Sequence, residues 1–389
     1  MEETVNDVVA EPPSWAELLG CNNWEGLLDP LDLSLRRFLL LCGDFCQCTY
    51  DAFDDDDNSP YAGSSRYGEK SFFHKVKFPS ASAYQISSFL YATATLDIPV
   101  TPDRETSFIG YVATSASTLP GGRGEIYVVW RGTKTNKEWI DVAHFEPVPA
   151  SAITPAADPA PNVMDGWLRI YTSSNPNSQS QTLSARDQLR AQILQLQGLY
   201  KDENLSIVVT GHSLGAALAV LSAFDLVENV VVPDIPVTAV VFGCPRVGDG
   251  AFVERLRTHR NLKILHAKNV LDPIPFYPQG FGYSGAGVEM VVDSRKSPWL
   301  RVIPKDLMDF HNLQGMLHVV AGWHGEEGEF EVAVKRSLAL VNKSCAFLKD
   351  ECKIPGSWWV AENRGMMLNE EGDWVLKPPL DDDCPAVPE

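Results

Sequence analysis

The chain has 389 residues, with 51 acidic and 32 basic side chains and a formal net charge of −19 at pH 7. A field of that sign repels nucleic acid and strongly anionic membrane surfaces, so we expect no nucleic acid partner and an easier approach to zwitterionic or uncharged surfaces. Hydrophobic residues make up 44% and charged residues 21%, which is typical of a globular chain that buries a sizeable core.

The N-terminal part of the chain predicts a disordered stretch followed by two helices. Residues 1–13 are expected to be disordered. Ser14 and Glu17 have the spacing of a capping box, in which each side chain bonds the backbone of the other residue at the start of a helix. From Pro30 to Tyr50 apolar residues recur near helical spacing, which indicates a second helix.

Signals for export and for membrane insertion are missing from the sequence. The first twenty residues are acidic, lack the apolar segment of a secretory signal and do not resemble an Arg-rich transit peptide. Apolar stretches such as Ala216–Phe224 are too short to span a bilayer, so no transmembrane segment is predicted. The eight cysteines form neither a disulfide scaffold nor a zinc pattern. We therefore expect a cytoplasmic protein with reduced cysteines and no bound metal.

The middle of the chain alternates strands with helices. Two strands separated by a Gly/Pro-rich turn are predicted at Phe108–Ala113 and Glu125–Trp130. The elements predicted next are helix Leu183–Tyr200, strand Leu205–Thr210, helix Leu214–Val227, strand Val237–Phe242, helix Phe252–Arg257 and strand Leu262–Ala267. This alternation indicates βαβ units and a largely parallel sheet, which the earlier strands and a hairpin predicted at Tyr283–Val292 make mixed. A last helix is predicted at Val332–Leu348, before a tryptophan-containing tail that we expect to pack on the core.

The pentapeptide Gly-His-Ser-Leu-Gly, which begins at Gly211, matches the pattern G-x-S-x-G. The pattern alone is weak, but here it lies between an apolar strand and an apolar helix, which is the context of a nucleophile elbow. Gly211 and Gly215 leave room for the sharp turn, while the side chain of His212 is expected to point away from the serine. Ser213 would then be exposed at the positive end of the helix. We interpret it as the nucleophile of a serine acyl hydrolase with the α/β-hydrolase fold.

A serine nucleophile needs a histidine base and an acid that orients it, and in this fold both follow the serine in the chain. Asp272 lies just past a predicted strand, at the carboxyl edge of the sheet, although an Asp-Pro turn explains it equally well. The histidines after it are His311, His318 and His324. Position alone favours His311 but leaves His318 open, even though the apolar setting of His318 suits a core residue.

Two backbone N–H groups are expected to form the oxyanion hole. One belongs to Leu214, the residue after the nucleophile, and the second should come from a loop after an early strand. Thr133 ends such a strand and can add a hydroxyl, although an ordinary strand-ending turn also explains this segment.

Several segments of the chain resemble the class 3 lipases. They are Gly-His-Ser-Leu-Gly from Gly211, Arg131-Gly-Thr133 with Glu138-Trp-Ile-Asp, Phe242-Gly-Cys-Pro-Arg-Val-Gly and Asn269-Val-Leu-Asp-Pro-Ile-Pro. Other segments resemble, more narrowly, the plant cytosolic phospholipase A1 (type II) group of that family. These are Trp15-Ala-Glu-Leu-Leu-Gly, Leu31 to Phe53, His311-Asn-Leu-Gln-Gly-Met-Leu-His and Pro355-Gly-Ser-Trp-Trp. The resemblance covers residues 14–378.

The resemblance implies an α/β-hydrolase with a mixed, mostly parallel sheet and an acyl hydrolase that prefers the sn-1 ester of glycerophospholipids. It implies a triad of Ser213, Asp272 and His311 and an oxyanion hole at Thr133 and Leu214. Because the match falls on the first histidine of its segment, the resemblance favours His311 over His318. No metal or organic cofactor is expected.

The same resemblance implies a lid near residues 134–145, with apolar surface from Trp139, Ile140 and Phe145. We expect the lid to act at a membrane or micelle surface that the protein meets transiently. The predicted organisation is a disordered stretch at 1–13, a lipase domain at 14–350 and a C-terminal extension with an acidic tail at 351–389.

Two other interpretations stay open from the sequence. One keeps the triad but changes the substrate, giving a galactolipid or neutral-glyceride lipase or a general carboxylesterase. The other is a lipase-like signalling or scaffold protein that binds an acyl ligand or partner without turnover. The first differs in the shape of the pocket and lid, which the sequence does not show. The second is disfavoured by the intact serine, aspartate and histidine candidates.

Overall fold

A computed structural model of the chain describes residues 11–56, 58–96, 103–117, 122–134, 144–155, 157, 159–359 and 366–376. Over these residues the central element is a seven-stranded sheet with the strand order β1-β2-β3-β6-β7-β9-β11. Its strands are β1 (Tyr84–Leu96), β2 (Asp103–Ser115), β3 (Arg123–Trp130), β6 (Asn204–His212), β7 (Val237–Phe242), β9 (Leu262–Asn269) and β11 (Val288–Val292). The first three pair antiparallel, whereas β3 and the strands after it run parallel. The predicted mixed, mostly parallel sheet is therefore confirmed.

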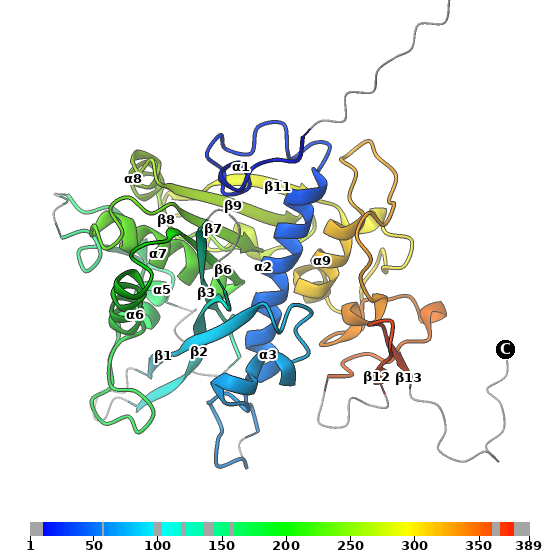
Figure 1. Cartoon of the computed structure of the whole chain (residues 1–389), viewed down its shortest axis with the longest axis horizontal. Coiled ribbons are helices and arrows are strands. Elements are labelled where there is room, and N and C mark those ends of the chain that lie inside the picture. The colour runs from blue at the N-terminus through cyan, green and yellow to red at the C-terminus, as the bar shows by residue number, and fades with distance from the viewer. Residues whose placement is uncertain are drawn as a thin grey trace, which may run out of the picture.

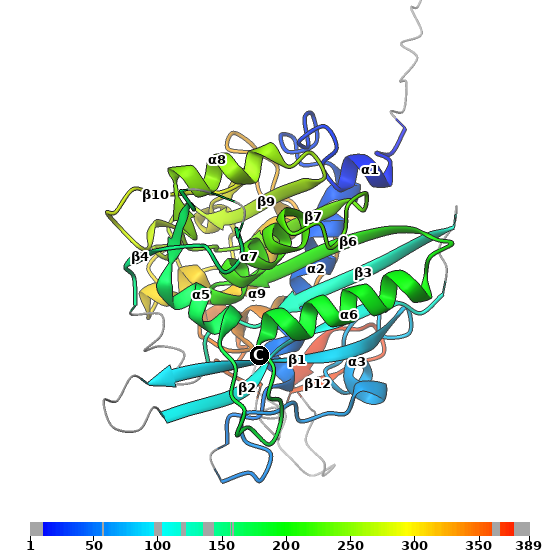
Figure 2. The same ribbon diagram turned by 90° about the vertical axis from the view of Figure 1, so that its left-hand side faces the viewer.

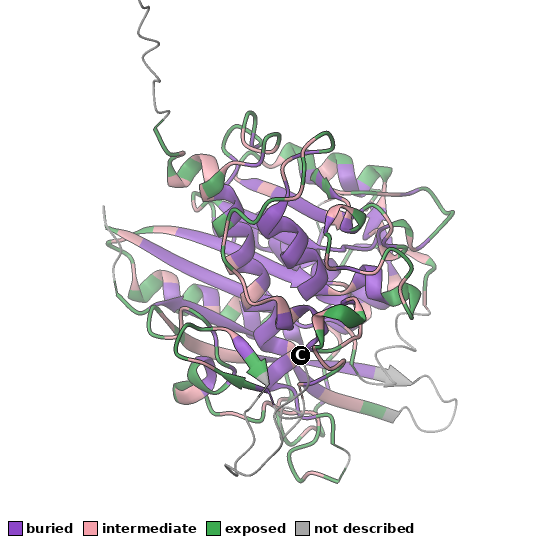
Figure 3. Ribbon diagram, turned by 90° about the vertical axis from the view of Figure 1, so that its right-hand side faces the viewer, coloured by how far each residue is buried: buried purple, intermediate pink, exposed green. Residues whose placement is uncertain are grey.

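Helices cover both faces of the sheet (Figures 1 and 2). They are α1 (Trp15–Leu18), α2 (Leu33–Ala52), α3 (Phe72–Lys75), α5 (Asp165–Thr172), α6 (Ala185–Leu199), α7 (Leu214–Glu228), α8 (Gly250–Thr258) and α9 (Leu313–Gly322). α2 and α9 pack in one hydrophobic cluster, and α5, α6 and α7 pack in another on the opposite face. Because both faces are covered, the central strands are buried almost throughout and are apolar on both sides (Figure 3).

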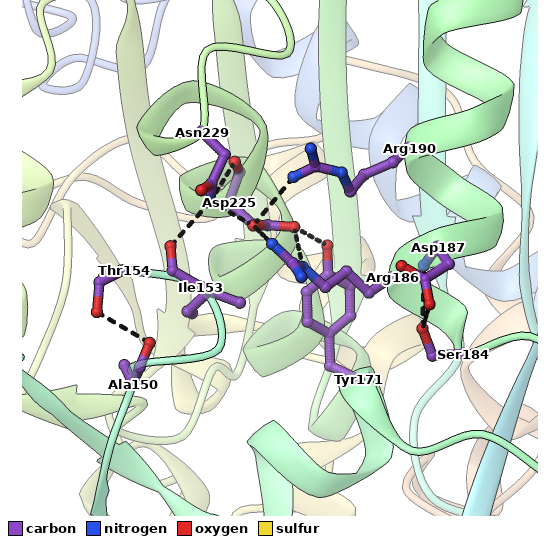
Figure 4. Close-up of polar contacts among 10 residues, drawn as sticks. All are labelled: Ala150, Ile153, Thr154, Tyr171, Ser184, Arg186, Asp187, Arg190, Asp225 and Asn229. Carbon is purple, nitrogen blue, oxygen red and sulfur yellow. Dashed lines mark hydrogen bonds and ion pairs between the residues drawn. The ribbon is translucent and has the colours of Figure 1, made fainter. Parts of the chain in front are cut away.

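The helix that follows the elbow, α7, is held in place by one buried carboxylate. All its residues from Leu214 to Val227 are buried, including Asp225, which has no exposed surface. Arg186 of α6 donates to both carboxylate oxygens, at 2.9 and 2.8 Å, and the hydroxyl of Tyr171 of α5 donates at 3.0 Å (Figure 4). Asn229 donates to the same carboxylate at 2.7 Å. The bonds fix α7 relative to both neighbouring helices.

Two smaller sheets and several 3₁₀ segments complete the described chain. The small strands are β4 (Pro147–Pro149), β5 (Asn162–Met164), β8 (Gly248–Asp249), β10 (Tyr283–Ser284), β12 (Met366–Leu368) and β13 (Trp374–Leu376). The 3₁₀ segments are η1 (Glu69–Ser71), η2 (Ile274–Phe276), η3 (Ser294–Lys296), η4 (Leu307–His311), η5 (Leu338–Asn342) and η6 (Asp350–Cys352).

Near the C-terminus, Trp358 and Trp374 pack with Met366 and Ala339 in a small buried cluster, and the Trp358 indole N–H donates to the Ala339 carbonyl at 2.7 Å. Trp358 and Trp374 are therefore buried, but in a cluster separate from the two large clusters that flank the sheet.

The predicted N-terminal helices are confirmed. Ser14 and Glu17 form the capping box at the start of α1, and α2 spans the second predicted helix. Among the described residues, none of the helices combines the length and the apolar character needed to cross a bilayer.

Two other predicted elements are wrong. The segment Tyr283–Val292 is not a hairpin, because β10 pairs with β8 in the small sheet and β11 extends the central sheet parallel to β9. The segment Val332–Leu348 contains only the 3₁₀ turn η5. Its start is not helical, because the N–H groups of Ala333 and Val334 donate to the Ala321 carbonyl near the end of α9 instead of to a helix of their own.

Candidate active site

A sharp turn at Ser213 joins β6 to α7. Ser213 has φ 61° and ψ −128°, a conformation that a residue with a side chain rarely adopts and that is typical of functional turns. A side chain at Gly211 would overlap the Gly215 backbone, and one at Gly215 would overlap the backbone at Trp130 and Arg131, so neither position can hold another residue without a shift. The turn leaves Ser213 partly exposed among buried neighbours, at the N-terminus of α7.

Asp272 and His311 form a buried hydrogen-bonded pair. Asp272 follows β9 and has no exposed surface, and its Oδ2 lies 2.7 Å from Nδ1 of His311. Its Oδ1 accepts from the N–H of Ile274 at 2.9 Å. Since the carboxylate accepts a hydrogen bond from Nδ1–H, the neutral ring has its lone pair on Nε2, a buried atom that has no hydrogen-bond partner among the described residues. An imidazole held in this way is poised to accept a proton at Nε2.

Gly243, just after β7, lies against this pair. Its φ of +54° is in the left-handed region, and a Cβ added there would lie 2.8 Å from Cε1 of His311 and 2.9 Å from Oδ2 of Asp272. Only glycine allows the backbone to approach the two side chains so closely. The position lies in the segment Phe242-Gly-Cys-Pro-Arg-Val-Gly, but the sequence reasoning gave Gly243 no role.

His212 connects the backbone of His311 to α2. Its Nε2 lies 2.8 Å from the His311 carbonyl, its Nδ1 lies 2.8 Å from the hydroxyl of Tyr50, and the two imidazole rings are 4.5 Å apart. Burial, and secondarily the neighbouring His311, hold the pKa of His212 well below its usual value. The neutral ring then donates from Nε2 to the carbonyl and accepts at Nδ1 from Tyr50.

Asn269, the last residue of β9, fixes the other side of the same segment. Its Nδ2 donates to the Phe310 carbonyl and to Oγ of Ser294, both at 3.1 Å, and its Oδ1 accepts from the Ser294 N–H at 3.2 Å. The backbone on either side of His311 is therefore bound by Asn269 and His212. Tyr50, Gly243 and Asn269 were not among the predicted site residues.

The strand end that carries Thr133 packs against the elbow. The Arg131 guanidinium is fully buried, donates to the carbonyls of Phe108 and Gly132 at 2.9 and 2.8 Å, and lies 4.0 Å from the Phe53 ring centroid. A Cβ on Gly132 would lie 2.8 Å from the His212 carbonyl. Thr133 follows Gly132 directly in the chain and is partly buried.

Of the predicted lid residues, Trp139 and Ile140 lie outside the described residues. Phe145 is 41% exposed, and its ring centroid is 6.2 Å from that of Phe281, which is 58% exposed. His318, the alternative base, is buried away from this pair: its Nε2 lies 2.8 Å from Oγ of Ser297, and its ring stacks on Phe330. It is the core histidine that its sequence context suggested.

A mostly parallel sheet with helices on both faces and a strand–serine–helix turn define a protein of the α/β-hydrolase class. Residues 127–281 match the family described as Lipase (class 3). Phospholipase A1-IIdelta of Arabidopsis thaliana is 48% identical, over 96% of this chain and 98% of that protein. Phospholipase A1-II 5 of Oryza sativa subsp. indica is 45% identical, over 98% of this chain and 87% of that protein. The chain therefore belongs to the class 3 lipases, within their plant phospholipase A1-II group.

Among solved structures, a triacylglycerol lipase from Penicillium expansum is 18% identical, with a TM-score of 0.46 over 68% of this chain and 81% of that one. Within the described part of this chain, no group of three or more histidine, cysteine or acidic side chains is arranged to hold a metal ion.

Proposed function

We propose that this chain is a phospholipase A1, which hydrolyses the sn-1 ester of glycerophospholipids through an acyl-enzyme. The observation that carries the proposal is the buried hydrogen bond between Asp272 and His311, in a chain whose Ser213 occupies a strand–turn–helix elbow. The phospholipase A1-II relatives, which match nearly the whole chain, support the substrate class.

In the proposed mechanism, Nε2 of His311 removes the hydroxyl proton of Ser213 as its oxygen attacks the ester carbonyl. The Asp272 carboxylate holds the ring in the required tautomer and stabilises the imidazolium. The N–H groups of Leu214 and Thr133 stabilise the oxyanion, and each such donor contributes about 3 kcal/mol to the transition state. His311 then protonates the leaving lysophospholipid oxygen, and water, deprotonated by the same histidine, releases the fatty acid.

The test compares Ser213→Ala with the unchanged chain on a phosphatidylcholine that carries different acyl chains at its two positions. We expect kcat to fall by at least about a thousandfold while the unfolding temperature stays unchanged, and we expect the unchanged chain to release mainly the sn-1 fatty acid. A fluorophosphonate probe should label the unchanged chain and not the variant.

Three outcomes would argue against this function. Retained hydrolysis by Ser213→Ala would remove the nucleophile assignment. A folded, unlabelled and inactive chain would favour the scaffold interpretation. Faster release from a galactolipid or triglyceride than from phosphatidylcholine would change the substrate class.

We further propose that the enzyme binds transiently to lipid surfaces through apolar side chains around the site. Val270 and Phe276 flank Asp272 and are 44% and 47% exposed. Ile303, which precedes η4, and Leu307, its first residue, are 85% and 72% exposed. Exposed apolar groups beside a catalytic site are suited to contact a lipid layer.

A cytoplasmic location is also proposed. The seven cysteines that the structure describes are free thiols, and Cys42, Cys46 and Cys48 are buried. Reduced cysteines are typical of proteins that work in a reducing compartment. Fractionation of cells that express the tagged chain tests this, because recovery in the secretory fraction would contradict it.

A further inference from the structure

A cavity lies at the amino ends of the central strands, whereas the candidate active site lies at their carboxyl ends. Its volume is about 460 Å³. It is lined by Trp15, Ala16, Leu19, Cys21, Arg123, Asn204, Leu205, Ser206, Pro236, Thr238, Arg260, Asn261 and Lys263. These residues come from the α1 region and from the amino ends of β3, β6, β7 and β9, or from the turns just before them. Ser213 follows the carboxyl end of β6, so the cavity is separated from it by the length of the strand.

The charged groups at this cavity are basic. Arg123, Arg260 and Lys263 line it, and no acidic residue does so within the described part of the chain. Arg123 is paired with Glu125 at 2.9 Å, whereas Nζ of Lys263 bonds the uncharged amide oxygen of Asn23 at 2.9 Å. Among the residues that the structure describes, Lys263 therefore has no acidic partner within ion-pair distance, and the exposed Arg260 adds a second positive charge. On a chain with a net charge of −19, this is a local site for an anion.

Apolar side chains, among them Trp15, Leu19 and Leu205, form part of the cavity lining, and the surrounding contacts fix its walls. The Trp15 indole N–H donates to Oγ of Ser206 at 3.1 Å, and Arg123 lies 4.4 Å from the Trp15 ring centroid. The hydroxyl of Thr238 donates to the Leu19 carbonyl at 2.8 Å, which holds the end of α1 over the strands. Such contacts make the cavity preformed, as ligand cavities usually are.

We propose that this cavity is a second, non-catalytic site for a free fatty acid. The acyl chain would lie against Trp15, Leu19 and Leu205, and the carboxylate would lie between Arg260 and Lys263. A single carboxylate on an apolar chain matches the basic groups and the apolar side chains of the lining. The volume of about 460 Å³ is near the small end for ligand cavities, which favours a molecule with one acyl chain over a phospholipid with two. The choice of a fatty acid rests on the proposed function, whose reaction releases one.

The first experiment titrates dodecanoate, below its micelle concentration, into the full chain whose Ser213 carries a long-chain alkyl phosphonate. The phosphonate fills the acyl site of the catalytic centre, so remaining binding that depends on Arg260 and Lys263 reports this cavity. We expect one site by calorimetry, with an affinity at least tenfold lower in Arg260→Glu/Lys263→Glu. The matched control is Arg257→Glu, an exposed arginine on α8 that pairs with Glu254 and does not line the cavity, and it should bind as the unchanged chain does.

A second measurement locates the acyl chain. A dibrominated fatty acid should quench tryptophan fluorescence, and Trp15→Phe should remove that quenching. Dodecanol should bind at least tenfold more weakly than dodecanoate, because it lacks the carboxylate. If labelling fails, Ser213→Ala is titrated with and without Arg260→Glu/Lys263→Glu, and the binding that these two changes remove is assigned to this cavity. Failure of the catalytic assignment and failure of this site therefore produce different results.

The proposal is overturned if the blocked chain does not bind dodecanoate, or if charge reversal leaves the affinity unchanged. It is also overturned if the double variant loses binding to vesicles of phosphatidylcholine and phosphatidylglycerol while dodecanoate affinity is kept, because the basic groups would then serve a lipid headgroup at a membrane surface.

Discussion

At the scale of single residues, Gly243 offers a sharp test of the candidate site. Replacement with alanine puts a methyl group 2.8 Å from the His311 ring at a backbone φ of +54°. Because displacement of a catalytic group by about 1 Å can lower a rate by about a hundredfold, we expect Gly243→Ala to reduce kcat on phosphatidylcholine by about that factor.

The matched control for this change is Gly250→Ala, at the first residue of α8. A Cβ there meets nothing within 4 Å, and the backbone is not in the left-handed region. We expect it to keep the kcat of the unchanged chain. Full activity of Gly243→Ala with an unchanged unfolding temperature would show that the Asp272–His311 geometry tolerates displacement or does not act in the reaction.

The sequence predicted those site residues whose role is indicated by the local sequence pattern. The two glycines and the strand–helix context predicted Ser213 as the nucleophile. The order of residues along the chain then limited the candidate acid to Asp272 and the candidate base to a small set of histidines. In the structure Asp272 and His311 are hydrogen-bonded. Their catalytic roles stay predictions. Contacts such as Tyr50 with His212 join residues 162 positions apart, and nothing in the local pattern indicates that two such segments meet.

At the scale of elements, the network around Asp225 controls how α5, α6 and α7 pack. Asp225→Ala leaves Arg186 without its bidentate partner and removes the acceptor of Tyr171. Loss of one member of a buried ion pair typically costs about 3–5 kcal/mol, so we expect the free energy of unfolding in urea to fall by about that amount.

Asp187→Ala on the neighbouring helix is the matched control. Asp187 bonds Ser184 in the N-terminal cap of α6 (Figure 4), and loss of part of a cap costs about 1 kcal/mol or less. Equal destabilisation by the two variants would mean that the buried network does not hold the helices together.

Elements with a strong local pattern, such as α2, β6 and α7, were predictable because apolar spacing and turn residues agree there. The failures have tertiary causes. Ser284 and Val288, on either side of Gly-Ala-Gly, pair with strands of two different sheets. The backbone N–H groups just after Val332 donate to a carbonyl near the end of α9. In both cases the bonding partner is remote in the sequence.

At the scale of the whole molecule, net charge and exposed apolar side chains together predict how the enzyme meets lipid. A chain of charge −19 should bind vesicles of phosphatidylcholine more strongly than vesicles that also contain phosphatidylglycerol, and added salt should reduce the difference. Ile303→Glu should weaken binding to phosphatidylcholine vesicles at least about tenfold, because burial of an isoleucine side chain contributes about 1.5–3 kcal/mol.

Sedimentation with vesicles measures both effects, in a Ser213→Ala background that leaves the lipid intact. Leu199→Glu is the matched control, since Leu199 is 67% exposed at the end of α6 and lies apart in sequence from the candidate site. If the Leu199 variant lost as much binding as the Ile303 variant, the contact with lipid would not be localised at the site.

The bond between Tyr50 and His212 has a consequence for where the chain can be divided. The stretch that matches the lipase family, residues 127–281, contains the serine and the aspartate but neither His311 nor the helix that holds Tyr50. A protein shortened to those limits would lose His311, the proposed proton acceptor, together with the support of its backbone. The smallest piece worth engineering runs from the start of α2 to the end of α9.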